Sequence, residues 1–190
     1  MLGVVSALAA LIVPIALAQT GSPPPGVYEP KAAVPSPPLR VEVIDGTRFR
    51  DVESKDVYRL YGIDTCAPGQ TARFNRQPWP CGTMATAWLV TATLNAWLAC
   101  RTLRDEASEH LARCSSAGHP DIAADMVREG IAVARPPTPE DPGVRAYAVA
   151  EQDARKAYRG LWSSTFQMPW DWRATIDRSR AAATQGGATP

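Results

Sequence analysis

Hydrophobic and polar residues alternate along the first part of the folded chain. Val43 and Phe49 stand in two short alternating runs that flank Asp45-Gly46. Asp-Gly between strand-like runs is a strong hairpin signal, because a type I′ turn needs positive φ. Residues 53–56 indicate a second turn, and residues 57–63 a third strand. The pattern therefore predicts a three-stranded β-meander at the start of the fold.

Hydrophobic residues farther along recur at helical spacing. The predicted elements after the meander are a helix over 83–96, strands over 98–104 and 109–115, a helix over 121–130, a short strand over 131–133 and a helix over 144–159. Asp121 is the predicted N-cap of the second helix, and Gly130 its end. This order predicts an α+β fold, and it fits a five-stranded OB-like Greek-key β-barrel with about three packed helices.

The two ends of the chain lack these patterns. Residues 1–18 are apolar and uncharged and end on Ala16-Leu17-Ala18, which predicts an export signal peptide, with an uncleaved N-terminal anchor as the alternative. Residues 19–39 are rich in Pro, Ser and Gly and indicate a linker. The folded domain is expected over 40–173, followed by a flexible tail over 174–190. Export would place the domain in the periplasm or outside the cell.

Composition changes this picture in two ways. The formal net charge is +1, which argues against a chain whose whole surface binds a polyanion. The chain has four cysteines, and an even count in an exported chain indicates disulfides, with three pairings allowed. No two of these cysteines have the spacing of zinc ligands. We expect a monomer, with no membrane span in the mature domain.

A set of short motifs carries further information through its order. The motifs are VIDGTRF, YRLYGIDTCAPGQ, HLARC, DIAADMVREGIAVA, RGLW and PWDWR. In this order the chain resembles the thermonuclease (staphylococcal nuclease-like, or SNase-like) family over roughly residues 41–173. The resemblance implies an OB-fold, one calcium ion held by oxygen ligands, two arginines on the phosphate, and hydrolysis of phosphodiester bonds in DNA or RNA.

Three residues keep the types that the family's site requires. By the resemblance, Arg59 contacts the phosphate, Asp64 is a calcium ligand, and Thr65 donates its backbone carbonyl to the ion. Asp45 is first of all a hairpin-turn residue and at most a weak ligand. These residues imply Ca2+ as the cofactor and nucleic acid as the partner class.

Three other positions depart from the family. Thr47 replaces an aspartate ligand, Ala67 replaces the glutamate that activates water, and Glu109 replaces the second phosphate arginine. Losing a general base costs about 10²–10⁴ in rate, and losing a charge-stabilising group costs about 10²–10³. We therefore expect a catalytically impaired or inactive domain, with calcium weakly held or lost, that serves as a binding or structural module for an unknown partner.

Two other functions stay open. An active calcium-dependent nuclease would take its missing carboxylates from Asp51, Glu53 or Glu106, if the first hairpin aligns differently. A single-stranded nucleic-acid binder would use the OB surface without cleavage, although the near-neutral charge disfavours it. Whether the chain is a hydrolase thus depends on the substituted positions.

The turn between the two strands over 98–115 also bears on the cysteines. Cys100 and Cys114 are equidistant from Ala107, the predicted turn centre. Residues equidistant from a hairpin turn face each other across antiparallel strands, within bridging distance. We therefore expect a Cys100–Cys114 disulfide, which leaves Cys66 to pair with Cys81.

Overall fold

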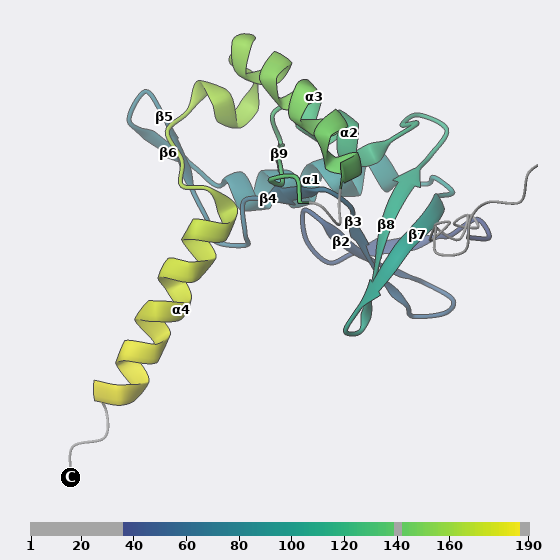
Figure 1. Cartoon of the computed structure of the whole chain (residues 1–190), viewed down its shortest axis with the longest axis horizontal. Helices are drawn as coiled ribbons and strands as arrows, with labels where there is room; N and C mark the ends of the chain where they lie inside the picture. Colours follow the sequence, from purple (N-terminus) through teal and green to yellow (C-terminus); the bar gives the residue numbers. More distant parts are fainter. Residues whose placement is uncertain (1–35, 139–141, 187–190) are drawn as a thin grey trace, which may run out of the picture. The chain divides into compact units, whose positions relative to one another are not determined.

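Five strands form the main sheet of the domain (Figure 1). The computed structural model describes residues 36–138 and 142–186, so the predicted leader over 1–18 and the linker up to residue 35 lie outside the described residues. The strands of this sheet are β1 (Val41–Val43), β2 (Arg48–Asp51), β3 (Val57–Leu60), β7 (Ala99–Glu106) and β8 (Glu109–Ser115). Their order is β1-β2-β3-β8-β7, in which β3 and β8 are parallel and the other neighbours antiparallel.

The two edge strands of this sheet are joined by a short backbone bridge. Leu39 precedes β1 and Leu98 precedes β7, and the two residues pair in the antiparallel sense. The Leu39 N–H donates to the Leu98 carbonyl at 2.7 Å, and the Leu98 N–H donates to the Leu39 carbonyl at 2.9 Å. The bridge brings the sheet back on itself, which agrees with the predicted OB-like barrel and with the α+β class.

The strand predicted over 57–63 is broken at Gly62, so the expectation of one continuous strand is wrong. This glycine has a φ of 74°, and a Cβ there would lie 2.7 Å from the ring of Tyr147. The chain therefore turns out of the main sheet after β3. The next strand, β4 (Ile63–Thr65), pairs with β9 (Ala132–Ala134) in a separate two-stranded sheet.

The described residues include four helices, of which all but the last pack around the strands. They are α1 (Cys81–Thr93), α2 (Ile122–Arg128), α3 (Arg145–Lys156) and α4 (Pro169–Gly186), with 3₁₀ turns η1 (Pro142–Val144) and η2 (Gly160–Ser163). Asp121 caps α2 as predicted, because its side chain accepts a hydrogen bond from the Ala124 N–H at 3.0 Å. Hydrophobic side chains of the barrel, α1, α2 and α3 share one core. Over residues 36–138 and 142–186, no helix is long and apolar enough to cross a membrane.

The segment expected to be a flexible tail, residues 174–190, instead continues a helix over most of its length. Helix α4 ends at Gly186. Residues 174–184 contain no glycine or proline and include alanines and arginines, which favour helix. Their side chains are nearly all exposed, so the helix needs no hydrophobic stripe. The lack of such a stripe in the sequence therefore misled the prediction.

Both disulfides form with the expected pairing. Cys100 and Cys114 are direct partners in the β7–β8 register, and Ala107, with a φ of 53°, lies in the turn between these strands. The other disulfide joins Cys66 to Cys81, whose Cα atoms are 5.7 Å apart. Each bridge therefore holds two segments that the chain order alone would leave free to separate.

A small hairpin lies between the two cysteines of the second disulfide. It consists of β5 (Ala72–Phe74) and β6 (Gln77–Trp79), which pair in the antiparallel sense. Cys66 and Cys81 belong to a separate small hydrophobic cluster beneath this hairpin. The hairpin is thus fastened to the domain at its base.

Candidate functional site

A cavity of about 550 Å³ lies among the β1–β2 turn, β4, the start of β8 and the start of α4. Every residue that the sequence analysis placed at the site lines it: Asp45, Thr47, Arg59, Asp64, Thr65, Ala67 and Glu109. Segments far apart in the chain therefore meet here. The cavity is also lined by residues that the sequence analysis did not assign, among them Arg48, Arg135, Trp170 and Arg173.

The β1–β2 turn is organised by the carboxylate of Asp45. One carboxylate oxygen accepts the backbone N–H groups of Thr47 and Arg48, both at 2.9 Å, and the Thr47 hydroxyl at 3.1 Å. The other oxygen accepts Nε of Arg48 at 2.8 Å. Asp45 is buried, so these bonds compensate its loss of water. The assignment of Asp45 as a turn residue thus agrees with its contacts.

The turn itself is not the predicted type I′ turn. Gly46 does not belong to the glycines with positive φ, and the turn spans more than two residues, since the Ile44 N–H donates to the Arg48 carbonyl. A Cβ at Gly46 would lie 2.5 Å from Oγ1 of Thr65 and 2.8 Å from Cβ of Ala85. Glycine is therefore needed here for close packing, which seats the hairpin directly against β4.

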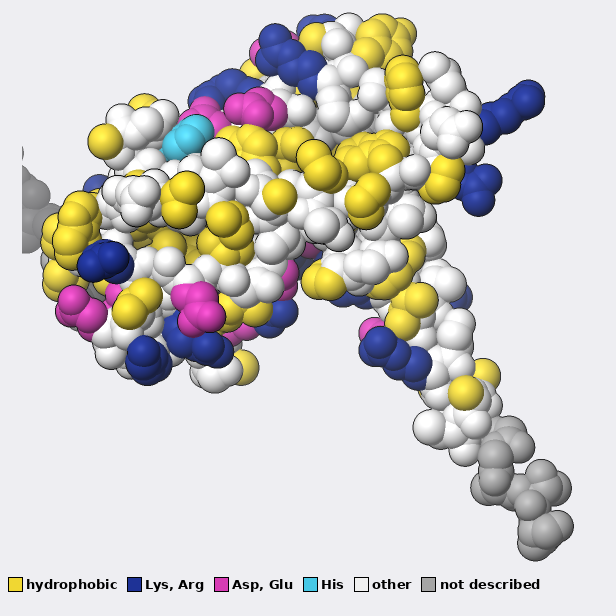
Figure 2. Space-filling model, turned by 180° about the vertical axis from the view of Figure 1, so that it is seen from behind, with side chains coloured by type: hydrophobic (Ala, Val, Ile, Leu, Met, Phe, Trp, Pro, Cys, Tyr) yellow, Lys and Arg dark blue, Asp and Glu magenta, His cyan; other side chains and the backbone are white. Residues whose placement is uncertain are grey.

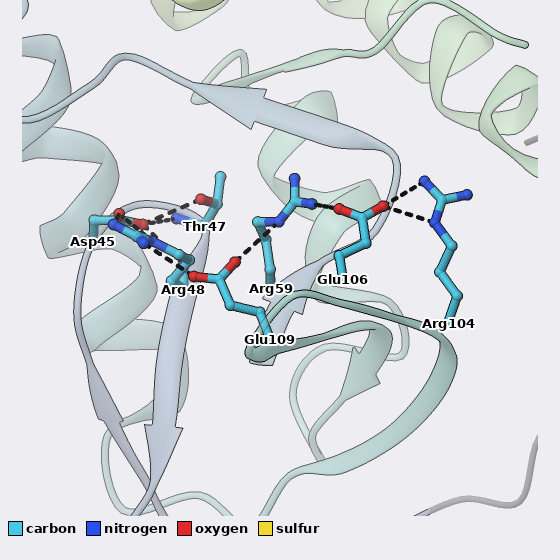
Figure 3. A network of polar contacts seen from close by, with 7 residues as sticks. All are labelled: Asp45, Thr47, Arg48, Arg59, Arg104, Glu106 and Glu109. Carbon is cyan, nitrogen blue, oxygen red and sulfur yellow. Dashed lines mark hydrogen bonds and ion pairs between the residues drawn. The ribbon is translucent and has the colours of Figure 1, made fainter. Parts of the chain in front are cut away.

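The carboxylate of Glu109 bridges two arginines in the cavity (Figure 3). Its Oε1 accepts Nη1 of Arg48 at 3.0 Å, and its Oε2 lies 3.3 Å from Nε of Arg59. The side chains of Arg59 and Glu109 are mostly buried, so water screens this contact less than on an open surface. The hydrogen bond to Asp45 is the main cause that raises the pKa of Arg48 above its usual range, against an opposing effect of burial. Arg48 therefore keeps its charge.

The network continues beyond the cavity to a second glutamate. Glu106 pairs with Arg59 on one side and with Arg104 on the other, the latter at 2.6 Å. Figure 3 shows the resulting row of alternating charges, from Asp45 to Arg104. Glu106 is thus engaged by two guanidinium groups.

The other candidate acids lie away from the cavity. Asp51 and Glu53 do not line it. The carboxylate of Asp51 accepts the Ser54 N–H at 2.8 Å. Burial acts to raise the pKa of Asp51, but hydrogen bonds from Ser54 and its neighbours outweigh it and lower that pKa. Glu53 is exposed in the same turn. Neither residue occupies a position that would replace Thr47 or Ala67.

Asp64, in the middle of β4, lies against a guanidinium from the last helix. Nη1 of Arg173 is 3.2 Å from one carboxylate oxygen, and Nη2 contacts the other. The Thr65 N–H donates to the first of these oxygens at 2.9 Å. The Asp64 side chain is only 14% exposed. A cation from α4 therefore neutralises the carboxylate that the sequence analysis expected to bind calcium.

The loop that carries Ala67 is rigidly held. The Ala67 N–H donates to Oε1 of Gln70 at 3.0 Å, and Nε2 of Gln70 donates to the Gln167 carbonyl at 2.7 Å. Gln70 is buried, and the adjacent Cys66–Cys81 disulfide closes the loop. A carboxylate is absent at Ala67, and the segment from Thr65 to Arg104 contains no aspartate or glutamate that could take its place.

Comparison with known proteins identifies the family of the chain. A family model described as Staphylococcal nuclease homologue (SNase) matches residues 57–164, more than half of the 190 residues. The chain belongs to the SNase homologue family. No curated protein matches the chain. The matched range contains Arg59, Asp64, Thr65, Ala67 and Glu109, whereas the hairpin with Thr47 precedes it.

In the cavity of this SNase homologue, each acidic side chain is paired with an arginine. Four arginines line it, and three acidic residues lie among them: Arg48, Arg59, Arg135 and Arg173 with Asp45, Asp64 and Glu109. Among the described residues, no group of three or more His, Cys, Asp or Glu is arranged as a metal site. The sequence contained a partial signal for the missed cation, since Arg173 ends the PWDWR motif. Its partner Asp64 lies 109 residues away and could not be inferred.

Proposed function

We propose that this SNase homologue does not cleave phosphodiesters at an ordinary rate and serves as a binding or structural module. The observation that carries the proposal is the bridge that Glu109 makes between Arg48 and Arg59. An internal carboxylate engages two guanidinium groups where a substrate phosphate would need them. A phosphate would have to displace Glu109 while its negative charge stayed nearby, which disfavours both binding and the transition state.

The missing base at Ala67 adds a second obstacle. Without a carboxylate at this position, no side chain of the rigid loop accepts the proton of an attacking water, and such a loss costs about 10²–10⁴ in rate. Replacing the second phosphate arginine with a glutamate removes a charge-stabilising group, which costs about 10²–10³. These losses do not simply multiply, because the residues act as a unit. Even the larger of the two alone would abolish ordinary nuclease activity.

The donor set fits calcium poorly. Calcium takes six to eight oxygen ligands, several of them charged. Asp64 is paired with Arg173, and Asp45 is used by the β1–β2 turn and by Arg48. The remaining oxygens are the Thr47 hydroxyl and the Thr65 carbonyl, both neutral. We therefore infer that calcium is held weakly or not at all, and we derive no step through it.

The retained residues are the argument for the alternative function. Arg59, Asp64 and Thr65 meet in one cavity, as an active calcium-dependent nuclease requires. Asp51, Glu53 and Glu106, which that alternative needs as substitutes, are absent from the cavity lining. A non-cleaving single-stranded nucleic-acid binder has less support, because three of the four cavity arginines, Arg48, Arg59 and Arg173, already have carboxylate partners.

We further propose that the domain works outside the cytoplasm, in the periplasm or beyond the cell. Two disulfides among the described residues are typical of an oxidising compartment. The apolar, uncharged run over residues 1–18 has the composition of an export signal or an anchor. We propose a monomer for the isolated protein in solution.

A cleavage assay tests the catalytic part. The purified protein, with its disulfides intact, is incubated with DNA and RNA in calcium and in chelator. Beside it are assayed the variant Thr47→Asp/Ala67→Glu/Glu109→Arg and the control variant Glu53→Arg, which changes charge outside the cavity. We expect chelator-sensitive cleavage from the triple variant alone. Robust chelator-sensitive cleavage by the unmodified protein would contradict the proposal.

A further inference from the structure

The charges of one continuous segment all have the same sign. From Thr65 to Arg104 the chain contains no aspartate or glutamate, although the net charge of the whole chain is only +1. The charged residues of this segment are Arg73, Arg76, Arg101 and Arg104, and residues 81–100 carry no charge at all. The segment includes β5, β6 and α1. Its composition is therefore unlike that of an ordinary mixed-charge surface.

The outer side of α1 and of the turn after it is hydrophobic. Helix α1 buries Ala85 and Leu89 against the domain. Its outward residues Met84 and Val90 are exposed, and in the following turn Leu94 is 66% and Trp97 58% exposed. A surface helix ordinarily turns charged residues to water. We call the surface of Met84, Val90, Leu94 and Trp97 the α1 face.

The hydrophobic and uncharged side chains form a continuous band on this side of the molecule. Figure 2 shows the band across the middle of the view from behind, with both basic and acidic side chains along its rims. Val90, Leu94 and Trp97 also line a shared groove of about 400 Å³, to which Arg40 contributes. Exposed apolar surface of this extent marks an interaction site.

Arginines stand at both ends of the α1 face. At one end the guanidinium of Arg40 lies over the ring of Trp97, 5.8 Å from its centroid. At the other end the β5–β6 hairpin leads into α1 and carries Arg73 and Arg76, with Phe74 between them 49% exposed. Among the described ion pairs, neither hairpin arginine has an acidic partner.

The hairpin holds these side chains in place. Arg73 and Thr165 exchange two backbone hydrogen bonds, each of 2.9 Å, and Nε1 of Trp79 donates to the Ser164 hydroxyl at 3.0 Å. The tip residues Asn75 and Arg76 have φ of 46° and 68°, which makes a tight turn. The exposed aromatic ring and its two arginines are therefore displayed on a fixed support.

We propose that the α1 face and the β5–β6 hairpin tip dock on the surface of an anionic lipid bilayer. An anionic bilayer has negatively charged phosphate headgroups above an apolar hydrocarbon layer. The protein surface has arginines that can pair with the headgroups and apolar side chains that can contact the hydrocarbon. Aromatic residues such as Phe74 and Trp97 favour the membrane interface. Arginines at the rim attract anionic headgroups and keep their charge in the polar layer. The proposal does not depend on the loss of nuclease activity.

Two other occupants fit the same surface less well. A second copy of the chain would bring arginine-rich rims toward each other, which is repulsive. A nucleic acid would satisfy the arginines and stack on Phe74, but it would leave Met84, Val90 and Leu94 without a counterpart. The combination of arginines at both ends with aliphatic surface between them therefore favours the bilayer.

Vesicle binding of the full chain tests the proposal. Co-sedimentation is measured with vesicles of phosphatidylglycerol and phosphatidylcholine, and with phosphatidylcholine alone. We compare the variant Arg73→Gln/Arg76→Gln with Arg145→Gln/Lys156→Gln, which removes the same charge from α3. The first pair should lower partitioning on anionic vesicles by about 20- to 30-fold, and the control pair by much less. All variants share residues 1–35, so any contribution of that segment is the same in each.

A local measurement shows which surface is bound. Hydrogen–deuterium exchange should slow over residues 72–79 and 94–99 when anionic vesicles are added, and stay unchanged over 145–156. The variant Leu94→Ser/Trp97→Ser should lose this protection. Equal loss of binding in the Arg73→Gln/Arg76→Gln and Arg145→Gln/Lys156→Gln variants, or protection elsewhere only, would overturn the proposal. The proposal would also be overturned if light scattering showed a dimer and the same residues were protected without lipid. It would likewise be overturned if a single-stranded oligonucleotide protected these residues to the same extent at equal salt.

Discussion

In the cavity, each acidic side chain lies against a guanidinium, whereas the α1 face carries no charge of its own and has arginines only at its ends. Glu109 bridges Arg48 and Arg59 within the domain. Arg73 and Arg76 have no such carboxylate among the described ion pairs. A charged side chain that is paired within the domain stabilises the fold and is less available to a ligand. A charged side chain without a partner can bind a ligand directly. The comparison teaches that the cavity with its paired charges and the surface with unpaired arginines lie in different places.

The largest effect is expected where covalent structure supports the cavity. The variant Cys66→Ala/Cys81→Ala should lower the free energy of unfolding by about 3 kcal/mol. The disulfide closes a loop with a sequence separation of 15, and a loop of this length restricts the unfolded chain by about that amount. Denaturant unfolding measures this loss. The matched variant Cys100→Ala/Cys114→Ala opens a loop of sequence separation 14 rather than 15 and should lose a similar amount.

The two disulfide variants should differ in one respect. Only the loss of Cys66–Cys81 should speed hydrogen exchange around Ala67, since Gln70 and the disulfide hold that loop together. Equal exchange at Ala67 in both variants would show that the Gln70 contacts alone keep the loop rigid, and the disulfide would have no part in holding it.

Asp45→Ala is expected to cost about 2 kcal/mol. The substitution leaves the Thr47 and Arg48 N–H groups and part of the Arg48 guanidinium without an acceptor in a buried turn. Thermal and urea unfolding measure the loss. Asp45→Asn keeps one acceptor oxygen and should lose clearly less. An unchanged stability in Asp45→Ala would mean that the turn does not depend on this carboxylate, and the cavity would be less internally bound than we infer.

Much of this site follows from the order of motifs along the chain. Arg59, Asp64, Thr65 and Ala67 lie within nine residues, and Glu109 follows a recognisable turn, so their meeting in one cavity could be predicted. The contact of Asp64 with Arg173 could not, because it depends on how α4 docks. Arg48 was also missed, since the Asp-Gly dipeptide suggested a two-residue turn rather than one whose carboxylate reaches forward to Arg48.

The fold shows the same division between local and tertiary causes. The helix cap at Asp121 and the β7–β8 hairpin were predictable from local chemistry. The break at Gly62 was not, because the approach of Tyr147 comes from α3. The Cys100–Cys114 pair illustrates a subtler case. The innermost pair of the hairpin is Glu106 with Glu109, and an irregularity between Thr102 and Arg104 shifts the register so that the two cysteines still meet.

Glu109→Gln should change binding more than stability. The neutral amide weakens both arginine contacts, and because Arg48 is 40% exposed we expect a loss of less than about 1 kcal/mol. Arg48 and Arg59 would then accept an external anion, so inorganic phosphate should raise the melting temperature of this variant and not of the unmodified protein. Glu42→Gln, from an exposed pair with Arg50, is the control. A phosphate response in the unmodified protein would show that Glu109 does not block the site.

The smallest effect on stability is expected on the α1 face. Leu94→Ser/Trp97→Ser should change the free energy of unfolding by no more than about 0.5–1 kcal/mol, since both side chains are mostly exposed and only Trp97 has a described partner, the guanidinium of Arg40. Urea unfolding gives this value, and Leu89→Ser on the buried side of α1 provides the contrast, with a loss of several kcal/mol. If the exposed pair proved as costly as Leu89→Ser, these side chains would serve the domain's own packing. The contrast with the cavity would then fail, because the side chains of both regions would stabilise the domain itself and neither region would offer a free surface to a partner.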